Sequence, residues 1–584
     1  MTNDNRGFEQ KGKGKILPIE EAIKRYVKPG MKLHLAGGFG GPSAAICEII
    51  RQYNDTGPEF ILIQSTLSGH ALNLIHSNLV KKLICSACVD MSVSGRPSRI
   101  IMKAHREKSI EMENWSLCSL QQRLMAGALG VPYMPTRSLR GSSIASDNKE
   151  SFQEIDNPFN LEEKVGIVKA LNPDISIVHA CVADMQGNSI LSAPYGDDLW
   201  GPLASTGGVL VTVEKIVPTE LIRRYSALVK IPSSSVNSVS LAPMGVHPFS
   251  FTNPGIDEFE PYEMDTEFLN DLHRASMNND TLNSWIKEWV VDCIDHDHYL
   301  KKLGDQRISK LKETRNIAVS QEVTPSMPES PLSKEGVSPK EMMLIVVARE
   351  VIKSVKKSKH KMILVGAGSR AIAALLAFYS LKAENYEVEL ITGNGQIGYT
   401  PQQGGSILPS ENSVRSSKML SDTITTHGVF VGGKNNKCLS VLGAGQIDKY
   451  GNINSTTTSQ GQFLVGSGGA NDSVNSREVI ITLNQSGDRF LNMLPYITSR
   501  GDNVTTVVST MGIYRKSNQD GEFYLTECFP TIEITNLAQM VKRIEDNCGW
   551  PLKLAPEVLE TSGPTEDEVQ LLRSLVSSFS GNED

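Results

Sequence analysis

The chain carries the same strand-and-loop pattern twice, and this repeat limits the folds that it can adopt. In each half an apolar segment runs into a glycine-rich loop and then a helical segment, at residues 32–43 and 362–381. In each half a later apolar segment ends in Asp-x-x-Gly-Asn, at residues 184–188 and 448–452. Strands that alternate with helices form βαβ units and a mainly parallel sheet. We therefore predict an α/β fold of two doubly wound, mainly parallel-sheet domains, related as an internal repeat.

A change in composition separates the two halves. The chain has 584 residues, which is more than one hydrophobic core usually supports. The stretch 317–339 is rich in Pro, Ser and Glu and has neither helical nor strand periodicity, which is typical of a linker. We expect a first domain over 1–310, a flexible linker over 311–339, a second domain over 340–575 and a polar tail over 576–584.

Composition argues against several classes of partner. The net charge is -7, and no basic stripe is interleaved with aromatic residues, so we expect no nucleic-acid partner. No run of ~18 apolar residues is present, so we expect no membrane partner. Residues 1–15 are polar, which argues against a secretory signal. The nine cysteines are scattered and odd in number, so we expect reduced thiols and a cytoplasmic protein.

Three motifs could hold a metal or a redox cofactor, and we favour another interpretation of each. Cys85 and Cys88 form a lone CxxC in an apolar segment, where buried thiols are favoured over zinc or redox chemistry. His296 and His298 are two apart on a helix predicted over 282–300, so they point to different sides of a solvated helix end. The loop 366–368 lacks the third glycine of a dinucleotide fingerprint. We expect no metal and no redox cofactor.

Taken together, the glycine loops and the paired aspartate motifs make most of the chain resemble the family I CoA-transferases. The resemblance is to the glutaconate CoA-transferase branch, with its α and β subunits fused in one chain. The segments similar to the α subunit are 27–31, 37–40, 126–137, 183–188, 211–217 and 242–248. The segments similar to the β subunit are 366–368, 445–454 and 466–472.

The resemblance implies an enzyme that acts on an acyl-CoA, with coenzyme A as part of the substrate and no separate cofactor. In the family, a β-subunit glutamate attacks the thioester, and a carboxylate acceptor then completes a ping-pong transfer. Backbone N–H groups of glycine loops would stabilise the oxyanion and line the CoA site. The loop residues so implied are Gly37, Gly38, Phe39, Gly40, Gly366, Gly368, Gly393, Asn394, Gly395, Gly466, Gly468 and Gly469.

This sequence departs from the family at the nucleophile, because the position of the glutamate is occupied by Gly393. Glu411, in Ser-Glu-Asn-Ser, is a tempting substitute, but it lies too far along the chain from Gly366, and we interpret it as a coincidental loop. We therefore predict cofactor-free hydrolysis or C–C bond cleavage of a CoA-linked keto or dicarboxylic acid. Two alternatives stay open: ordinary CoA transfer between carboxylic acids, and an inactive CoA-thioester-binding protein.

Branches of this fold without the glutamate use an acid from the α half, and here the matching candidate is Glu113. We expect burial against Trp115 to raise the pKa of Glu113 and make it a general base; the alternative is a charge at a helix N-terminus. Arg137 could hold a substrate carboxylate, although a structural salt bridge is equally compatible with the sequence. The family's heterotetramers imply a homodimer of fused chains.

Overall fold

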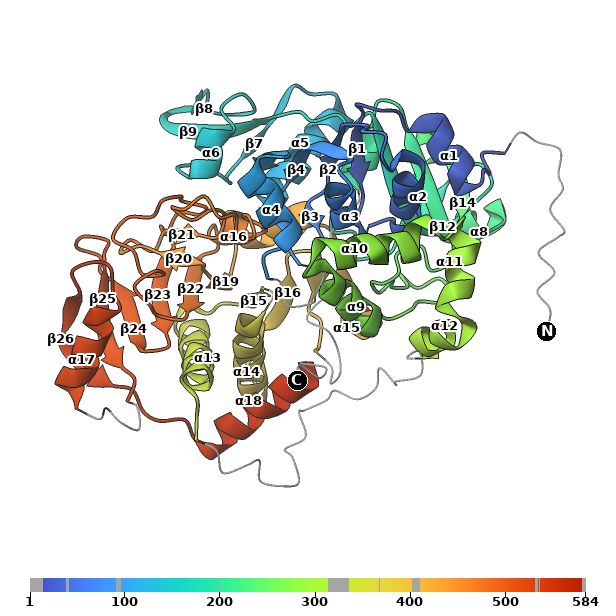
Figure 1. Ribbon diagram of the computed structural model, residues 1–584. Coiled ribbons are helices and arrows are strands. Elements are labelled where there is room, and N and C mark those ends of the chain that lie inside the picture. Colours follow the sequence, from blue (N-terminus) through green and yellow to red (C-terminus); the bar gives the residue numbers. More distant parts are fainter. Residues whose placement is uncertain are drawn as a thin grey trace.

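The computed structural model describes residues 14–37, 41–90, 96–197, 199–313, 336–366, 368–401, 410–530, 534 and 536–579. Figure 1 shows two sheet-containing halves side by side, the first coloured blue to green and the second yellow to red. The first half ends with α12 (Asp305–Lys312), and the second begins with α13 (Pro339–Ser358). Most of the predicted linker, residues 314–335, lies outside the described residues.

The first half is built on a parallel sheet. Its strands run in the order β6 (Glu111–Asn114), β4 (Val80–Cys85), β2 (Phe60–Ile63), β1 (Lys32–Leu35), β10 (Ile175–Ala183), β12 (Val209–Ile216) and β14 (Val236–Leu241), and all these neighbours are parallel. Two short antiparallel strands, β11 (Ser189–Ile190) and β13 (Val229–Ile231), continue from β10. Every residue of β10 is buried, because helices and loops cover both faces of the sheet.

Helices and a small antiparallel sheet surround this core. The helices are α1 (Ile19–Tyr26), α2 (Ser43–Tyr53), α3 (His70–His76), α4 (Arg99–Glu107), α5 (Leu117–Leu129), α6 (Ser143–Asp147), α7 (Trp200–Ala204), α8 (Thr219–Arg224), α9 (Thr266–Ser276), α10 (Asn279–Ile286) and α11 (His296–Leu303). The small sheet consists of β7 (Tyr133–Thr136), β9 (Asn160–Lys169) and β8 (Phe152–Asn157). The single helix predicted over 282–300 is wrong, because the chain passes through a π-type turn over Lys287–Val291 and leaves the helix before Asp295 caps α11.

The second half has a parallel centre with antiparallel edges. The parallel strands run in the order β16 (Glu389–Thr392), β15 (Met362–Val365), β19 (Cys438–Gly443), β22 (Glu478–Leu483) and β23 (Val504–Ser509). One edge carries antiparallel β17 (Gln396–Ile397) and β18 (Met419–Leu420). The other carries β24 (Gly512–Lys516), β25 (Phe523–Cys528) and β26 (Lys553–Glu560), of which the last is parallel to its neighbour.

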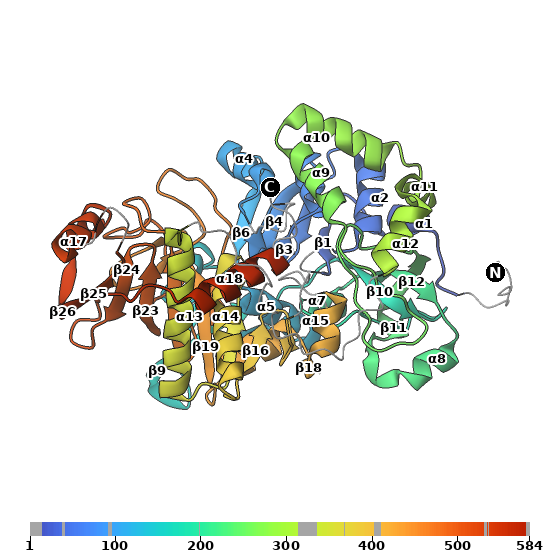
Figure 2. The ribbon, with the colours of Figure 1, turned by 90° about the horizontal axis from the view of Figure 1, so that it is seen from below.

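Three helices, α13, α14 (Ser369–Ala383) and α18 (Glu566–Phe579), cover one face of the second sheet (Figures 1 and 2). Ser338 and Glu341 form a capping box at the start of α13, where Pro339 takes the first helical position. α18 packs Leu572 and Leu575 into this layer and ends at Phe579, four residues after the expected end of the second domain at 575. Within the described residues, no helix is long and apolar enough to cross a membrane.

The two sheets confirm the predicted internal repeat. The order β2-β1-β10-β12-β14 in the first half matches β16-β15-β19-β22-β23 in the second. Asp184 Oδ1 accepts hydrogen bonds from the N–H groups of residues 186 and 188, and Asp448 Oδ1 accepts them from residues 450 and 452. Both turns also place a glycine with positive φ at the fourth position, Gly187 at 98° and Gly451 at 82°. The two Asp-x-x-Gly-Asn motifs therefore form equivalent turns.

Candidate active site

The loop 466–469 of the second half is held by backbone hydrogen bonds from the first half. Cys88 N donates to Val465 O at 2.8 Å, Gly468 N donates to Ser86 O at 2.9 Å, and Leu117 N donates to Gly468 O at 3.1 Å. Gly466 has a φ of 97°, and a Cβ there would lie 2.5 Å from Ser86 O. Glycine is therefore required for the two halves to approach this closely.

The loop 393–395, which follows β16, is held in a similar way by residues 195–197. Gly196 N donates to Asn394 O at 3.1 Å, and Thr423 N donates to Gly196 O at 3.1 Å. Gly395 has a φ of 112°, and a Cβ there would overlap Ser421 O. Two of the predicted glycine loops thus lie at the boundary between the halves, at the edge of the sheet where ligands of parallel sheets bind.

Asp472, three residues after the loop 466–469, anchors the boundary between the two halves. Its carboxylate accepts hydrogen bonds from the hydroxyls of Ser116 and Ser138, each at 2.6 Å, and from Cys118 N at 3.0 Å. All three donors belong to the first half, and the Asp472 side chain is buried. Neighbouring Asn471 also accepts from Leu139 N at 2.7 Å. This set of charge-assisted hydrogen bonds fixes the loop on the first half.

His427 fills the space between the two loops. A Cβ on Gly393 would lie 2.7 Å from His427 Nε2, and a Cβ on Gly469 would lie 2.9 Å from the same atom. The imidazole is 4% exposed, and neither ring nitrogen has a hydrogen-bond partner among the described residues. Burial lowers the pKa of His427, against the opposing effect of Asp472, so the ring is neutral at pH 7.

The backbone around His427 is a π-type helix over Ile424–Val431, in which Gly432 N donates to His427 O at 2.9 Å, five residues back. Such turns are uncommon and occur often at functional sites.

Asp197 adds a buried carboxyl group from the first half. Thr423 Oγ1 donates to Asp197 Oδ1 at 3.0 Å, and Ser65 also donates to this carboxylate. Burial raises the pKa of Asp197 to about 6, assisted by the charges of Asp472 and Asp422 and opposed by the two hydroxyls. The group therefore changes charge in the range where a general acid or base is useful.

The glycine loop after β15 lies one strand from Gly393, because Val365 pairs with Thr392 in the parallel register. Gly368 has a φ of 84° and precedes α14. The Arg370 side chain passes beside Gly366, where a Cβ would lie 3.0 Å from its Nε. In the equivalent first-half loop, Gly37 O accepts from Gln64 Nε2 at 2.9 Å; Gly38, Phe39 and Gly40 lie outside the described residues.

Glu113 is ion-paired, and the expected rise of its pKa is wrong. Its carboxylate lies 2.6 Å from Arg123 Nη1 and 2.8 Å from Lys82 Nζ, and it accepts from Trp115 Nε1 at 2.9 Å. Burial favours the neutral form, but these three partners outweigh it and lower the pKa of Glu113. Glu113 lies on β6 rather than at a helix N-terminus. Its catalytic role stays a prediction.

Arg137 and Glu411 both connect the two halves. Arg137 Nη1 donates to Gly432 O at 2.5 Å, next to the π-type helix that carries His427. Glu411 is 7% exposed and accepts from Asn253 N at 2.8 Å. The expectation that Arg137 holds a substrate carboxylate stays a prediction.

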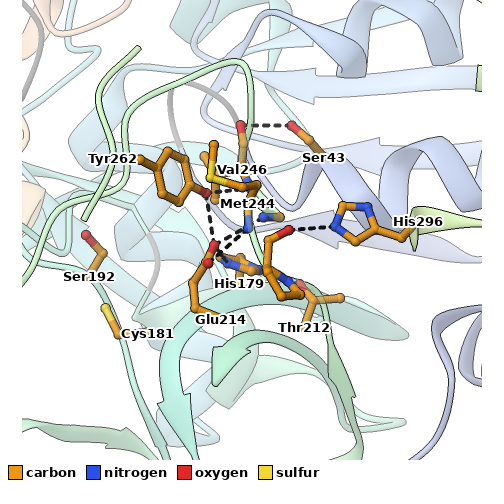
Figure 3. Close-up of polar contacts among 12 residues, drawn as sticks. Ser43, His179, Cys181, Ser192, Thr212, Glu214, Met244, Val246, Tyr262 and His296 are labelled. Carbon is orange, nitrogen blue, oxygen red and sulfur yellow. Dashed lines mark hydrogen bonds and ion pairs between the residues drawn. The ribbon is translucent and has the colours of Figure 1, made fainter. Parts of the chain in front are cut away.

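Glu214 on β12 is the centre of a buried polar cluster in the first half (Figure 3). Its carboxylate accepts hydrogen bonds from His179 Nε2 at 2.9 Å, Tyr262 Oη at 3.0 Å, Met244 N at 2.9 Å and Gly245 N at 3.1 Å. Burial opposes ionisation, but these donors outweigh it and lower the pKa of Glu214. The cluster fixes the segment 242–248, one of the segments that carried the family resemblance.

The other candidate metal or redox residues have structural contacts. Cys85 and Cys88 are buried, and their sulfur atoms are 3.5 Å apart. The ring of His296 bonds Pro243 O at 2.7 Å through Nε2. Among the described residues, no three metal-binding side chains converge.

The structure brings forward three residues that sequence reasoning missed: His427, Asp197 and Arg370. His427 follows Ile-Thr-Thr in a segment without a motif, and its meeting with Gly393 depends on the π-type turn. Asp197 comes from the other half of the chain. Arg370 had a signal, since it stands four residues after the glycine that opens the loop.

Comparison with known proteins places these loops in a family. The sequence model described as coenzyme A transferase matches residues 16–242. The A-type subunit of glutaconate CoA-transferase from Acidaminococcus fermentans is 32% identical over 319 residues, which cover 51% of this chain and 94% of that protein. The B-type subunit of 3-oxoadipate CoA-transferase from Pseudomonas knackmussii is 28% identical over 265 residues, which cover 41% of this chain and 93% of that protein. These two types of subunit thus each match about half of the chain, as a fusion of the two predicts.

Solved structures include folds that resemble nearly the whole chain. The acyl-CoA transferase YdiF from Escherichia coli O157:H7 has a TM-score of 0.65 at 16% identity, covering 96% of this chain and 97% of that chain. At this identity the likeness concerns the fold alone.

Proposed function

Because this chain belongs to the coenzyme A transferase family, we propose that it uses water to cleave a CoA-linked keto or dicarboxylic acid without a cofactor. The cleaved bond is either the thioester itself or a carbon–carbon bond of the acyl group. Coenzyme A enters as part of the substrate, and the glycine loops hold its pantetheine arm and the oxyanion.

The contact between Gly393 and His427 carries this proposal. Transfer through the enzyme needs a carboxylate nucleophile at the tip of β16, and the resemblance puts that carboxylate at position 393. Glycine has no side chain to attack, and the space where one would begin is filled by the imidazole, 2.7 Å from the Cβ position. The arrangement supports a reaction in which water replaces the covalent intermediate.

We assign the general base of this reaction to His427. The neutral imidazole takes a proton from water, and the hydroxide adds to the carbonyl carbon. The carbon–carbon bond then breaks, and its electron pair passes to the thioester enolate, which takes the proton back from the imidazolium. For thioester hydrolysis the leaving pair passes to the CoA sulfur instead. Both routes balance without a redox partner.

The test is an incubation with a panel of acyl-CoAs, with and without acetate or succinate as acceptor, followed by mass spectrometry. We expect cleavage products that incorporate one oxygen of labelled water and do not depend on the acceptor. Borohydride reduction should trap no enzyme–CoA thioester. A CoA adduct on Glu411 would establish ordinary transfer, and an absence of turnover across the panel would leave the binding-protein alternative.

We also propose that the fused chain forms a homodimer, on the analogy of a family built from paired subunits. Light scattering coupled to size-exclusion chromatography should give twice the mass of 63.8 kDa. A single-chain mass would contradict this.

A further inference from the structure

Arg370 is a half-buried cation in the second half of the chain. Its Nε is buried, and neither a hydrogen bond nor an ion pair joins the guanidinium to any residue that the structure describes. Burial lowers the pKa of Arg370, and no carboxylate opposes that effect. Removing a charge from water without a counter-ion is costly, so a fold that keeps one has a use for it.

The surroundings of Arg370 are partly exposed to solvent. The guanidinium lies between the tips of β15 and β19, where a Cβ on Gly366 would be 3.0 Å from Nε and a Cβ on Gly443 would overlap Nη1. Gly366, Gly443 and Gly445 are only half-buried. Arg370 is also in the first turn of α14, a helix of 15 residues whose N-terminal N–H groups favour an anion.

A second unpartnered group faces the same edge of the sheet. His427 lies over the tip of β16, which pairs with β15, and neighbouring parallel strands are about 4.8 Å apart. The uncharged imidazole and the unpaired cation are therefore separated by one to two strand widths. A short acyl chain can reach from one to the other.

We propose that Arg370 is the residue that binds a second carboxylate on the acyl group of the substrate. This inference rests on the proposed reaction site at Gly393 and His427. A guanidinium can hold a carboxylate through two parallel hydrogen bonds, which also fixes the direction of the acyl chain. The carbonyl that water attacks, either that of the thioester or a ketone on the acyl chain, is then presented to His427.

A phosphate of coenzyme A is the other anion that such a cation could bind. The whole pantetheine arm separates the phosphates from the thioester, whereas Arg370 is next to the proposed reaction centre. The position of Arg370 therefore favours a carboxylate of the acyl group, and the experiment below includes the phosphate as a separate arm.

The test measures binding of two thioethers, S-carboxypropyl-CoA and S-butyl-CoA, which differ by one carboxylate. Neither has a thioester to cleave, so the result does not depend on which reaction the enzyme performs. We expect Arg370→Met to weaken the binding of S-carboxypropyl-CoA by ~10²-fold and the binding of S-butyl-CoA by less than ~3-fold, measured by calorimetry. Arg370→Lys keeps the charge and should lose less, which gives an answer if the methionine variant does not fold.

Arg137→Met is the matched variant, because sequence reasoning gave that residue the same role. It should weaken both thioethers equally, since Arg137 bonds Gly432 O. If Arg137→Met, and not Arg370→Met, selectively lost binding of S-carboxypropyl-CoA, the inference would be overturned. If Arg370→Met weakened the binding of both thioethers and of free CoA equally, Arg370 would be assigned to a phosphate of coenzyme A. That result would also overturn the inference.

Discussion

Glu214 in the first half and Arg370 in the second are both charged side chains close to the ends of parallel strands. Glu214 accepts four hydrogen bonds from His179, Tyr262 and the backbone of 244–245, and its charge is stabilised where it lies. Arg370 has no partner among the described residues. The difference separates two uses of a charged side chain: Glu214 holds a loop in place, whereas the use proposed for Arg370 is to bind a ligand.

The same contrast applies to two of the buried histidines, His179 and His427. His179 bonds Thr212 through Nδ1 and Glu214 through Nε2, while both nitrogens of His427 lack partners in the described part of the chain. Buried polar groups are nearly always hydrogen-bonded, so an unpartnered one needs an explanation. The catalytic role proposed for His427 supplies one.

Replacing His427 gives the largest expected effect. His427→Gln keeps a polar side chain of similar size but removes the base, so turnover should fall by ~10²–10⁴-fold. S-butyl-CoA binding and the thermal midpoint should stay close to wild type. Turnover within a few-fold of wild type would show that an unpartnered histidine carries no function here, and the comparison with His179 would fail.

Glu214→Gln tests the charged group that has hydrogen-bond partners. Removing the charge from a buried cluster should lower the free energy of unfolding by about 3 kcal/mol, measured by urea denaturation. Turnover per folded molecule should be unchanged. Glu220→Gln is the control, since Glu220 is exposed, and its effect should stay within about 0.5 kcal/mol. A stable Glu214→Gln variant without turnover would place Glu214 in the reaction.

Asp197 is an intermediate case between the hydrogen-bonded Glu214 and the unpartnered Arg370. Two hydroxyls donate to its carboxylate, but its pKa is nevertheless raised. The folded chain binds this proton more tightly than the unfolded chain, whose aspartate pKa is 3.8. The stability that this provides is complete below about pH 4 and is lost as the pH rises through about 6. Asp197→Asn should remove this dependence, which amounts to roughly 3 kcal/mol at most. The measurement is the difference in unfolding free energy between the two proteins across that range, and a constant difference would contradict the prediction.

Glu113 resembles Glu214 on a smaller scale, because it too is stabilised as an anion but is itself more exposed. Its lowered pKa makes it a poor base at neutral pH, so Glu113→Gln should change turnover by less than ~5-fold. The expected loss of stability is about 1 kcal/mol, since the side chain is 17% exposed. A fall in turnover of ~10²-fold would instead restore the role predicted from the sequence.

Periodicity and glycine loops predicted the fold well. The alternation of apolar and helical segments predicted the two parallel sheets. The Asp-x-x-Gly-Asn motifs at 184 and 448 predicted equivalent turns. These features are local, because a strand, a tight turn and a helix start depend on residues that are adjacent in the chain. The antiparallel strands β24 and β25 and the break after Ile286 depend on tertiary packing, and the local pattern did not predict them.

The site was predicted only in part, because its polar groups meet across long distances in sequence. The loops 393–395 and 466–469 were identified, but their contacts with Ser86 and Gly196 come from the other half of the chain. Glu113 shows the limit most clearly: Trp115 is visible two residues away in the sequence, whereas the pairing with Arg123 and Lys82 depends on where α5 and β4 lie. The sign of a pKa shift follows from such partners.

The contacts of Asp472 have a consequence for assembly. Since the second-half carboxylate is bonded by Ser116, Ser138 and Cys118 N, the loop beside His427 takes its shape only when the first half is present. In a fused chain this docking is a unimolecular step, and the two halves meet at a high effective concentration whatever the amount of protein. Expressed as two separate polypeptides, the halves would dock in a second-order step, so activity would fall on dilution and return on concentration.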